Sequence, residues 1–384
     1  TIKFGCNFMI QYATEYAPCV IKLNKLNDIG YEILNRFFDG CTYLTSDKEI
    51  VIPEKITYID GMFRGCTKFN SKVIFNNKMI SCFGAFDGCT SFNQPITIPS
   101  SVSNCESMFS GCSNLNSTIV IGENVTNCNS MFRDCIRFNK YVAIPSKVTD
   151  CANMFYGATS FDQEIRIPDS VENMSGMFKG CKAFIRPVKI PTNVTDLSST
   201  FEGCKLFNQP ITIPAKVKNC ASMLKDCVKF NQPVTIVESN TKFNANNMFL
   251  GCTNFNQPID FKDRAASATY LFKNCANFNQ PFTIPSSISS CMQMFFGCKS
   301  FNQPIVIPEN VTNCSMMFVS CTSFNQNLIL HNNIKSCPSM FNGCTSFNQP
   351  IELPLSVTTC RQMFKGCTAL TSVISNWNKT YTNS

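Results

Sequence analysis

Residues 85–107 read A-F-D-G-C-T-S-F-N-Q-P-I-T-I-P-S-S-V-S-N-C-E-S, and this stretch decides the fold because the chain repeats it. Versions of the pattern recur from Phe37 onward; one copy opens at Met108 and the next at Met131, 23 residues later. Only the copies that open at Phe37 and Met223 run to 25 residues. A fixed period of this length is typical of a solenoid, in which each unit buries its apolar face by stacking on its neighbours. We therefore predict a repeat solenoid of about 15 coils.

Each copy contains one short segment with the pattern of a strand. Ile96, Thr97 and Ile98 alternate between apolar and polar residues, which indicates a half-buried strand, and Pro99 ends it. Because equivalent residues of successive coils stack, we expect one short parallel strand in every coil, with Thr97 facing outward.

The remainder of the copy suggests a turn on the opposite side of the coil. Val102 and Cys105 lie three residues apart, and this spacing predicts a short helical or 3₁₀ turn. Gly88 fits a tight bend because glycine adopts positive φ without a steric penalty. The aromatic columns that contain Phe86 and Phe92 are predicted to form the core.

An asparagine follows the second aromatic column in most copies. An amide side chain offers both a hydrogen-bond donor and an acceptor, so it can satisfy backbone groups of its own coil and of the next. We favour a structural asparagine ladder over a ligand-binding role. Its predicted members are Asn93, Asn116, Asn139, Asn208, Asn231, Asn256, Asn279, Asn302, Asn325 and Asn348.

The 25 cysteines invite a disulfide interpretation, but their columns favour free thiols. Fourteen occupy the fifth repeat position, where Ala158 substitutes once, and nine occupy the twenty-first, where Met174 and Leu197 substitute. A column that exchanges Cys for Ala, Met or Leu requires a small apolar group and not a bonded partner. Free thiols also fit synthesis in a reducing compartment. With a single histidine and no C-x-x-C motif, no metal site is predicted.

The repeat suggests one long domain within the 384 residues. We predict an N-terminal cap or docking segment at residues 1–36, a solenoid at 37–370 and a C-terminal tail at 371–384. Thr1 is compatible with an intact chain made without a signal peptide and therefore synthesised in the cytoplasm, and also with a mature chain cut from a longer one. No apolar run approaches the roughly 20 residues that cross a bilayer, so no membrane insertion is expected.

The motifs resemble the BspA-like leucine-rich repeats, whose unit also has about 23 residues. The F-R-G-C step at 63–66 is similar to that family's A-F-x-G-C step, and I-P-E-K-I at 52–56 to its I-P-x-x-V/I segment. The F-N-Q and V-x-N-M-x-x-M-F features, plainest at 154–165 and 171–178, resemble a repeat of bacterial surface lipoproteins. The resemblance implies a leucine-rich-repeat-like α/β fold, mostly β, wound as a right-handed superhelix. It also implies a surface adhesin or binding module of a bacterium, protist or virus.

The sequence gives little sign of catalysis. His331 is the single histidine, so no Ser/His/Asp or Cys/His arrangement is available. No phosphate-binding loop, dinucleotide glycine pattern or calcium loop occurs. The net charge of +8 is dispersed, without the basic runs that bind nucleic acid. We therefore expect neither an enzyme nor a cofactor, and no nucleic-acid partner.

The repeat consensus is most disturbed in the fourth to seventh copies, and outward positions there are candidates for a binding face. The candidate contact residues are Lys140, Tyr141, Glu164, Arg166, Arg186 and Lys189. We predict a non-enzymatic binding or adhesion solenoid on a virus particle or cell surface that recognises a protein or glycan of a host or neighbouring surface. The alternative is a structural decoration or scaffold component of a virion or other large assembly, contacting only other components of that assembly.

Overall fold

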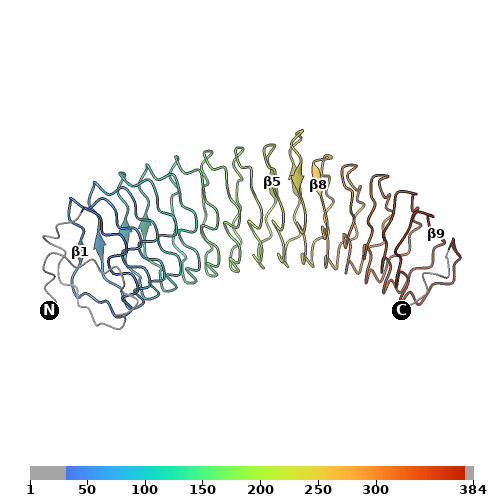
Figure 1. Cartoon of the computed structure of the whole chain (residues 1–384), viewed down its shortest axis with the longest axis horizontal. Helices are drawn as coiled ribbons and strands as arrows, with labels where there is room; N and C mark the ends of the chain where they lie inside the picture. Colours follow the sequence, from blue (N-terminus) through green and yellow to red (C-terminus); the bar gives the residue numbers. More distant parts are fainter. Residues whose placement is uncertain (1–31, 377–384) are drawn as a thin grey trace. The chain divides into compact units, whose positions relative to one another are not determined.

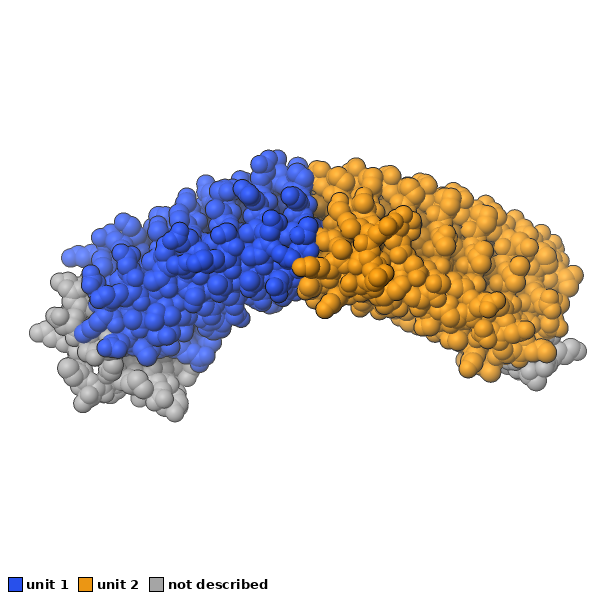
Figure 2. All heavy atoms as spheres, turned by 90° about the horizontal axis from the view of Figure 1, so that it is seen from above, with its two compact units in different colours: residues 1–193 blue, residues 194–384 orange. Residues whose placement is uncertain are grey.

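The computed structural model describes residues 32–376, and the contacts within it divide the chain into two compact units, residues 1–193 and 194–384 (Figure 2). Residues 1–31 of the predicted N-terminal segment and 377–384 of the predicted tail lie outside the described residues. The single solenoid domain at 37–370 stays a prediction.

Within each unit the chain forms successive coils that lie side by side and pair through short parallel strands (Figure 1). In the first unit β1 (Ile50–Val51) pairs with β2 (Val73–Ile74), and β3 (Ile96–Thr97) pairs with β4 (Ile119–Val120). In the second unit three further parallel pairs form, β5 (Ile211–Ile213) with β6 (Val234–Ile236), β7 (Phe243–Asn244) with β8 (Ala265–Ser267), and β9 (Ile351–Glu352) with β10 (Ile374–Ser375). The predicted repeat solenoid with short parallel strands is confirmed. A strand in every coil is not, because the strand position of the repeat forms no strand at residues 142–144, 165–167, 188–190, 259–261, 282–284, 305–307 and 328–330.

The register follows the repeat, because Ile96 pairs with Ile119 and Thr97 pairs with Val120, each 23 residues away. Ile96 is 2% exposed and Ile98 is 2% exposed, whereas Thr97 faces solvent. The alternation seen in the sequence therefore marks the buried and outward sides of the strand, as predicted.

The core consists of two stacked phenylalanine columns. Phe318 is fully buried, with its ring centroid 4.3 Å from that of Phe324, 5.6 Å from Phe295 and 5.7 Å from Phe341. The rings of successive coils are nearly parallel, at 2° and 5° for the last two pairs. Each buried ring contributes about 1.5–3 kcal/mol of hydrophobic stabilisation, and each stacked pair about 0.5–1.5 kcal/mol more.

The side of the coil opposite the strand contains no helix among residues 32–376, so the predicted helical or 3₁₀ turn is wrong. It is a chain of single turns. Met108 N–H donates to the Cys105 carbonyl three residues back, but the intervening Ser107 N–H donates to Asn129 in the next coil. Ser107 adopts a φ of 55° and Gly111 a φ of 69°. This alternation directs every second amide towards the neighbouring coil, which a helix cannot do.

Two polar ladders hold the turns together. Asn93 Oδ1 accepts the N–H of Asn116 at 2.8 Å. The same bond repeats in the first unit as far as Asp162 and the N–H of Ile185, and in the second unit from Asn208 to Asn348 and the N–H of Thr371. The first series ends at Ile185, which has no side-chain oxygen. These asparagines are exposed or half-buried. A second ladder was not predicted. The Oδ1 of Asn104 accepts the N–H of Glu106, two residues later in the same coil. The backbone of Asn104 forms a parallel β-bridge with Asn127 of the next coil.

The described cysteines are packed in the core with free sulfhydryl groups. Of 23 described cysteines, 21 are buried, and Cys41 and Cys367 are half-buried. In the fifth repeat position the thiol donates a hydrogen bond to a carbonyl of the preceding coil, as from Cys112 Sγ to Phe86 O at 3.1 Å. Burial raises the pKa of the Cys112 thiol well above its usual range, so the sulfur keeps the proton that this bond requires.

Replacing Cys112 by Ala should lower the free energy of unfolding by only about 1 kcal/mol, as expected for a small buried truncation. The Phe86 carbonyl keeps a partner, because it also accepts the N–H of Cys89 at 3.0 Å. Ala158 occupies the equivalent position naturally and is fully buried. The measurement is chemical denaturation of both proteins, with thiol titration of native and denatured samples. A loss of several kcal/mol, or oxidised cysteines in fresh protein, would contradict the free-thiol assignment.

Candidate functional site

The outward residue of each strand forms a column on the surface of the coils. In the second unit Thr212 and Thr235 lie in this column and are paired in register, each between buried isoleucine or valine residues. In the first unit the same repeat position holds Arg166 and Lys189, both exposed. Residues 165–167 and 188–190 form no strand, but the two cations occupy equivalent positions of consecutive coils and line the same hollow.

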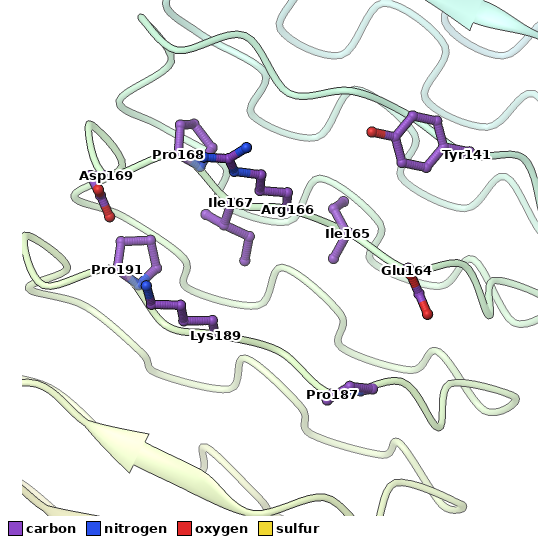
Figure 3. A pocket seen from close by; sticks show the side chains of 10 residues that line it. All are labelled: Tyr141, Glu164, Ile165, Arg166, Ile167, Pro168, Asp169, Pro187, Lys189 and Pro191. Carbon is purple, nitrogen blue, oxygen red and sulfur yellow. The ribbon is translucent and has the colours of Figure 1, made fainter.

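A surface hollow of about 540 Å³ opens at these residues, entirely within the first unit (Figure 3). Arg166 and Lys189 extend in the same direction from their coils, towards Pro168 and Pro191 (Figure 3). Tyr141, which is 59% exposed, and the carboxylates of Glu164 and Asp169 complete its polar lining.

The structure brings four of the six candidate residues together in this hollow: Tyr141, Glu164, Arg166 and Lys189. Lys140 is exposed but does not line it. Arg186 is half-buried and already engaged, since its Nη2 lies 2.9 Å from Asp162 Oδ2 and its Nε donates to the Asp162 carbonyl at 3.2 Å. Asp162 continues the asparagine ladder by accepting the N–H of Ile185. Arg186 therefore contacts a member of the asparagine ladder, and its guanidinium is not available to a partner.

The charged groups of the hollow are not neutralised by one another. Within residues 32–376, Arg166 and Lys189 form no ion pair, and neither do Glu164 and Asp169. Two cations, two carboxylates and an exposed phenol ring offer both donors and acceptors to a polar ligand. The lining contains no cysteine, serine or histidine that would serve as an activated nucleophile.

The single histidine plays a local structural part in the second unit. His331 Nε2 lies 2.8 Å from the Pro308 carbonyl, and its Nδ1 accepts the N–H of Asn333 at 3.2 Å. Across the described part of the chain, no group of three His, Cys, Asp or Glu side chains is placed to hold a metal ion. No helix in residues 32–376 has the length and apolarity to cross a membrane.

Comparison with solved structures identifies the fold. A leucine-rich repeat protein from Bacteroides ovatus is 20% identical, with a TM-score of 0.50 over 91% of this chain and 85% of that one. A leucine-rich repeat protein from Eubacterium ventriosum is 15% identical, with a TM-score of 0.42 over 93% of this chain and 85% of that one. The first of these shows the leucine-rich repeat fold. No curated protein matches the chain in sequence.

One family model accounts for the repeats. It matches six overlapping segments, at residues 32–143, 84–190, 122–211, 168–263, 190–284 and 266–377. Together these matches cover the phenylalanine, cysteine and asparagine columns from the first described coil to the last. The chain thus has the leucine-rich repeat fold and belongs to the family described as Mycoplasma protein of unknown function, DUF285.

Proposed function

We propose that this protein is a non-enzymatic binding module that recognises a partner macromolecule through the hollow between Tyr141 and Pro191. The observation that carries the proposal is the convergence of four residues that depart from the repeat consensus on that one hollow: Tyr141, Glu164, Arg166 and Lys189. These residues contribute nothing to the phenylalanine core, so folding does not account for them. A solenoid can vary such outward positions without disturbing its stacking.

The chemistry of the hollow favours a polar partner such as a protein loop or a glycan. Arg166 and Lys189 carry unpaired charge, and the exposed ring of Tyr141 provides a flat apolar face beside them. Tyr and Arg are enriched where interfaces carry most of their binding energy. The backbone beneath these side chains is fixed by the stacked coils, so ordering it on binding carries a small entropic penalty.

We place this module on the surface of a cell or virus particle, where the partner is a protein or glycan of a host or neighbouring surface. Support comes from the repeat itself, because the bacterial surface proteins whose repeats it resembles are built from similar units. An extended array of coils also presents its outward column to a surface along its whole length.

The double substitution R166T/K189T should weaken attachment at least tenfold while leaving the melting temperature nearly unchanged. Threonine already occupies this column at Thr212 and Thr235, so the strands remain compatible with it. The assay compares binding of labelled protein to a glycan array and to immobilised cell-surface proteins at low and high salt. Because the lost contacts are charged, only the unsubstituted protein should lose affinity as salt rises.

Two controls make this result specific. T212A/T235A alters the same column in the other unit and should leave attachment unchanged. R186Q restores the glutamine that most coils carry at that position, removes the two contacts of Arg186 with Asp162, and should leave attachment unchanged. Unaltered attachment in R166T/K189T would exclude the hollow as the binding site.

A further inference from the structure

The second unit exposes a group of aliphatic side chains that the core does not use. Val306 is 82% exposed, Ile329 80%, Leu355 90% and Val373 73%, and we call these four residues the aliphatic patch. Single exposed apolar residues are ordinary, whereas contiguous ones mark an interaction surface. Val306 and Ile329 stand at the outward strand position of consecutive coils, where Thr212 and Thr235 show that a polar residue suffices.

Three members of the aliphatic patch line the same surface hollow. Ile329, Leu355 and Val373 line a space of about 920 Å³ within the second unit, together with Glu309 and Glu352. This hollow is distinct from the one at Arg166, which lies in the first unit.

The rim of this second hollow is acidic and unpaired. No lysine or arginine is among its lining residues, and neither Glu309 nor Glu352 forms an ion pair within residues 32–376. Glu352 accepts only a neutral hydrogen bond, from Asn376 Nδ2 at 3.3 Å. The chain as a whole carries a net charge of +8, so an acidic, aliphatic surface is a local exception.

The walls of the hollow are held in place by hydrogen bonds between coils. His331 stands where neighbouring coils have Pro308 and Pro354, and its ring bridges to the Pro308 carbonyl at 2.8 Å. Asn333 Nδ2 donates to the Glu309 carbonyl at 2.8 Å, which fixes the backbone that carries this carboxylate. The surface is therefore preformed, which favours affinity for a matching ligand.

The order of apolar and acidic side chains along the coils suggests which kind of ligand this surface binds. Ile329 and Glu352 occupy equivalent outward positions of consecutive coils and line the same hollow, so an apolar side chain and a carboxylate are presented together. We propose that the aliphatic patch and its two glutamates form a second docking surface, whose occupant is an extended peptide segment of a partner protein that carries aliphatic and basic side chains. The aliphatic groups would cover Ile329, Leu355 and Val373, and the basic groups would pair with the glutamates.

Fluorescent peptides of stated sequence provide the probe for a test with the full chain at physiological salt. We expect an acetylated and amidated (Leu-Lys)₄ peptide to bind at least tenfold more tightly than (Leu-Glu)₄ or (Ser-Lys)₄, because only the first has both features. The substitutions V306T/I329T/L355S and E309Q/E352Q should each weaken its binding about tenfold or more. All five positions are exposed, so the variants should fold, which circular dichroism verifies.

The control V120T removes an exposed aliphatic residue from the same column in the first unit and should not change peptide binding. Equal affinity for all three peptides, or binding that neither set of substitutions weakens, would overturn the proposal. Dimerisation of the wild-type chain in sedimentation experiments, abolished by V306T/I329T/L355S, would assign the surface to a second copy and also overturn it. R166T/K189T should leave peptide binding intact, so this test fails or succeeds independently of the proposed function.

Discussion

Raising the pH above about 9 should unfold this protein cooperatively. The cause is the number of thiols in the core. The pKa of eighteen of the 21 buried cysteines lies above its usual value. Burial is the main cause in seventeen of them, and at Cys314 the hydrogen bond with Cys291 comes first, followed by burial. For Cys128 and Cys337 burial raises the pKa to about 12. In the unfolded chain the same groups ionise near pH 8.5.

The sign of the effect follows from proton linkage. Between about pH 8.5 and 12 the folded thiol of Cys128 retains a proton that the unfolded one has lost, so the folded state binds more protons and loses stability as pH rises. Each such thiol lowers the free energy of unfolding by about 1.4 kcal/mol per pH unit. Together the raised thiols approach roughly 20 kcal/mol per unit, which exceeds the ~5–15 kcal/mol that stabilises a typical domain. Below about pH 8 this contribution is fully present.

Circular dichroism across pH 7–11 under reducing conditions gives the midpoint of the transition, which we expect between about pH 9 and 10. Urea unfolding at about pH 8.5 in weak buffer, below this transition, should release on the order of ten protons per chain. Replacing Cys112 and Cys135 together by Ala removes two of the titrating groups and should make the dependence on pH measurably shallower. Stability that stays constant from pH 8 to 10 would show that the cysteines are oxidised or already ionised in the folded state.

The core and the strands were predictable because the repeat exposes them. Fifteen variations on one pattern show which positions tolerate change, so Phe86 and Phe92 were identified as core and Thr97 as outward. Stacking identical columns also fixes the register, because only an offset of one repeat aligns Ile96 with Ile119. The period of the repeat was therefore sufficient to predict the core positions and the strand register.

The turn region was predicted wrongly because periodicity does not distinguish a helix from a chain of turns. Val102 and Cys105 are both buried with a spacing of three, which either structure would give. The informative signal was the column of Ser107, where serine, asparagine and glycine recur and φ is positive. The ladder of Asn104 was missed for a related reason: its side chain bonds to an amide two residues on, and such local bonding leaves no apolar pattern.

The candidate site was predictable as a region but not residue by residue. Departures from the consensus located Arg166 and Lys189 correctly on one hollow. The sequence could not separate these from Arg186, whose position favours glutamine and whose guanidinium contacts Asp162 in the preceding coil. The aliphatic patch was also missed, because Val306 and Ile329 suit a strand equally well whether their side of the sheet is buried or exposed.

Arg264 is a buried residue that repeat periodicity does not single out, and it lies beside one of the two 25-residue copies. Its side chain is fully buried, and within residues 32–376 the guanidinium is held by hydrogen bonds to carbonyl oxygens and not by a carboxylate. The guanidinium donates to the carbonyls of Thr241, Pro214, Val237, Ala215 and Val217, at 2.8–3.1 Å, and its carbon lies 5.2 Å from the centre of the Phe243 ring. These carbonyls come from the two preceding coils. Arg264 thus connects the longer copy to its neighbours, at the place where the pairing of β7 with β8 shifts register between Phe243 and Asn244.

Replacing Arg264 by Met should lower the free energy of unfolding by roughly 3–5 kcal/mol, because several buried carbonyls lose their donors at about 1–3 kcal/mol each. Lysine should recover only part of this loss, since an ammonium group has three donors and cannot reproduce the planar fork of the guanidinium. Denaturant unfolding measures the total, and hydrogen exchange locates it: residues 211–267 should open first, while residues 32–193 keep their protection. R166M provides the matched control, because it removes an exposed arginine and should change stability by less than about 0.5 kcal/mol. An R264M protein as stable as the wild type would show that water replaces the guanidinium without penalty, and the longer copy would then need no such anchor.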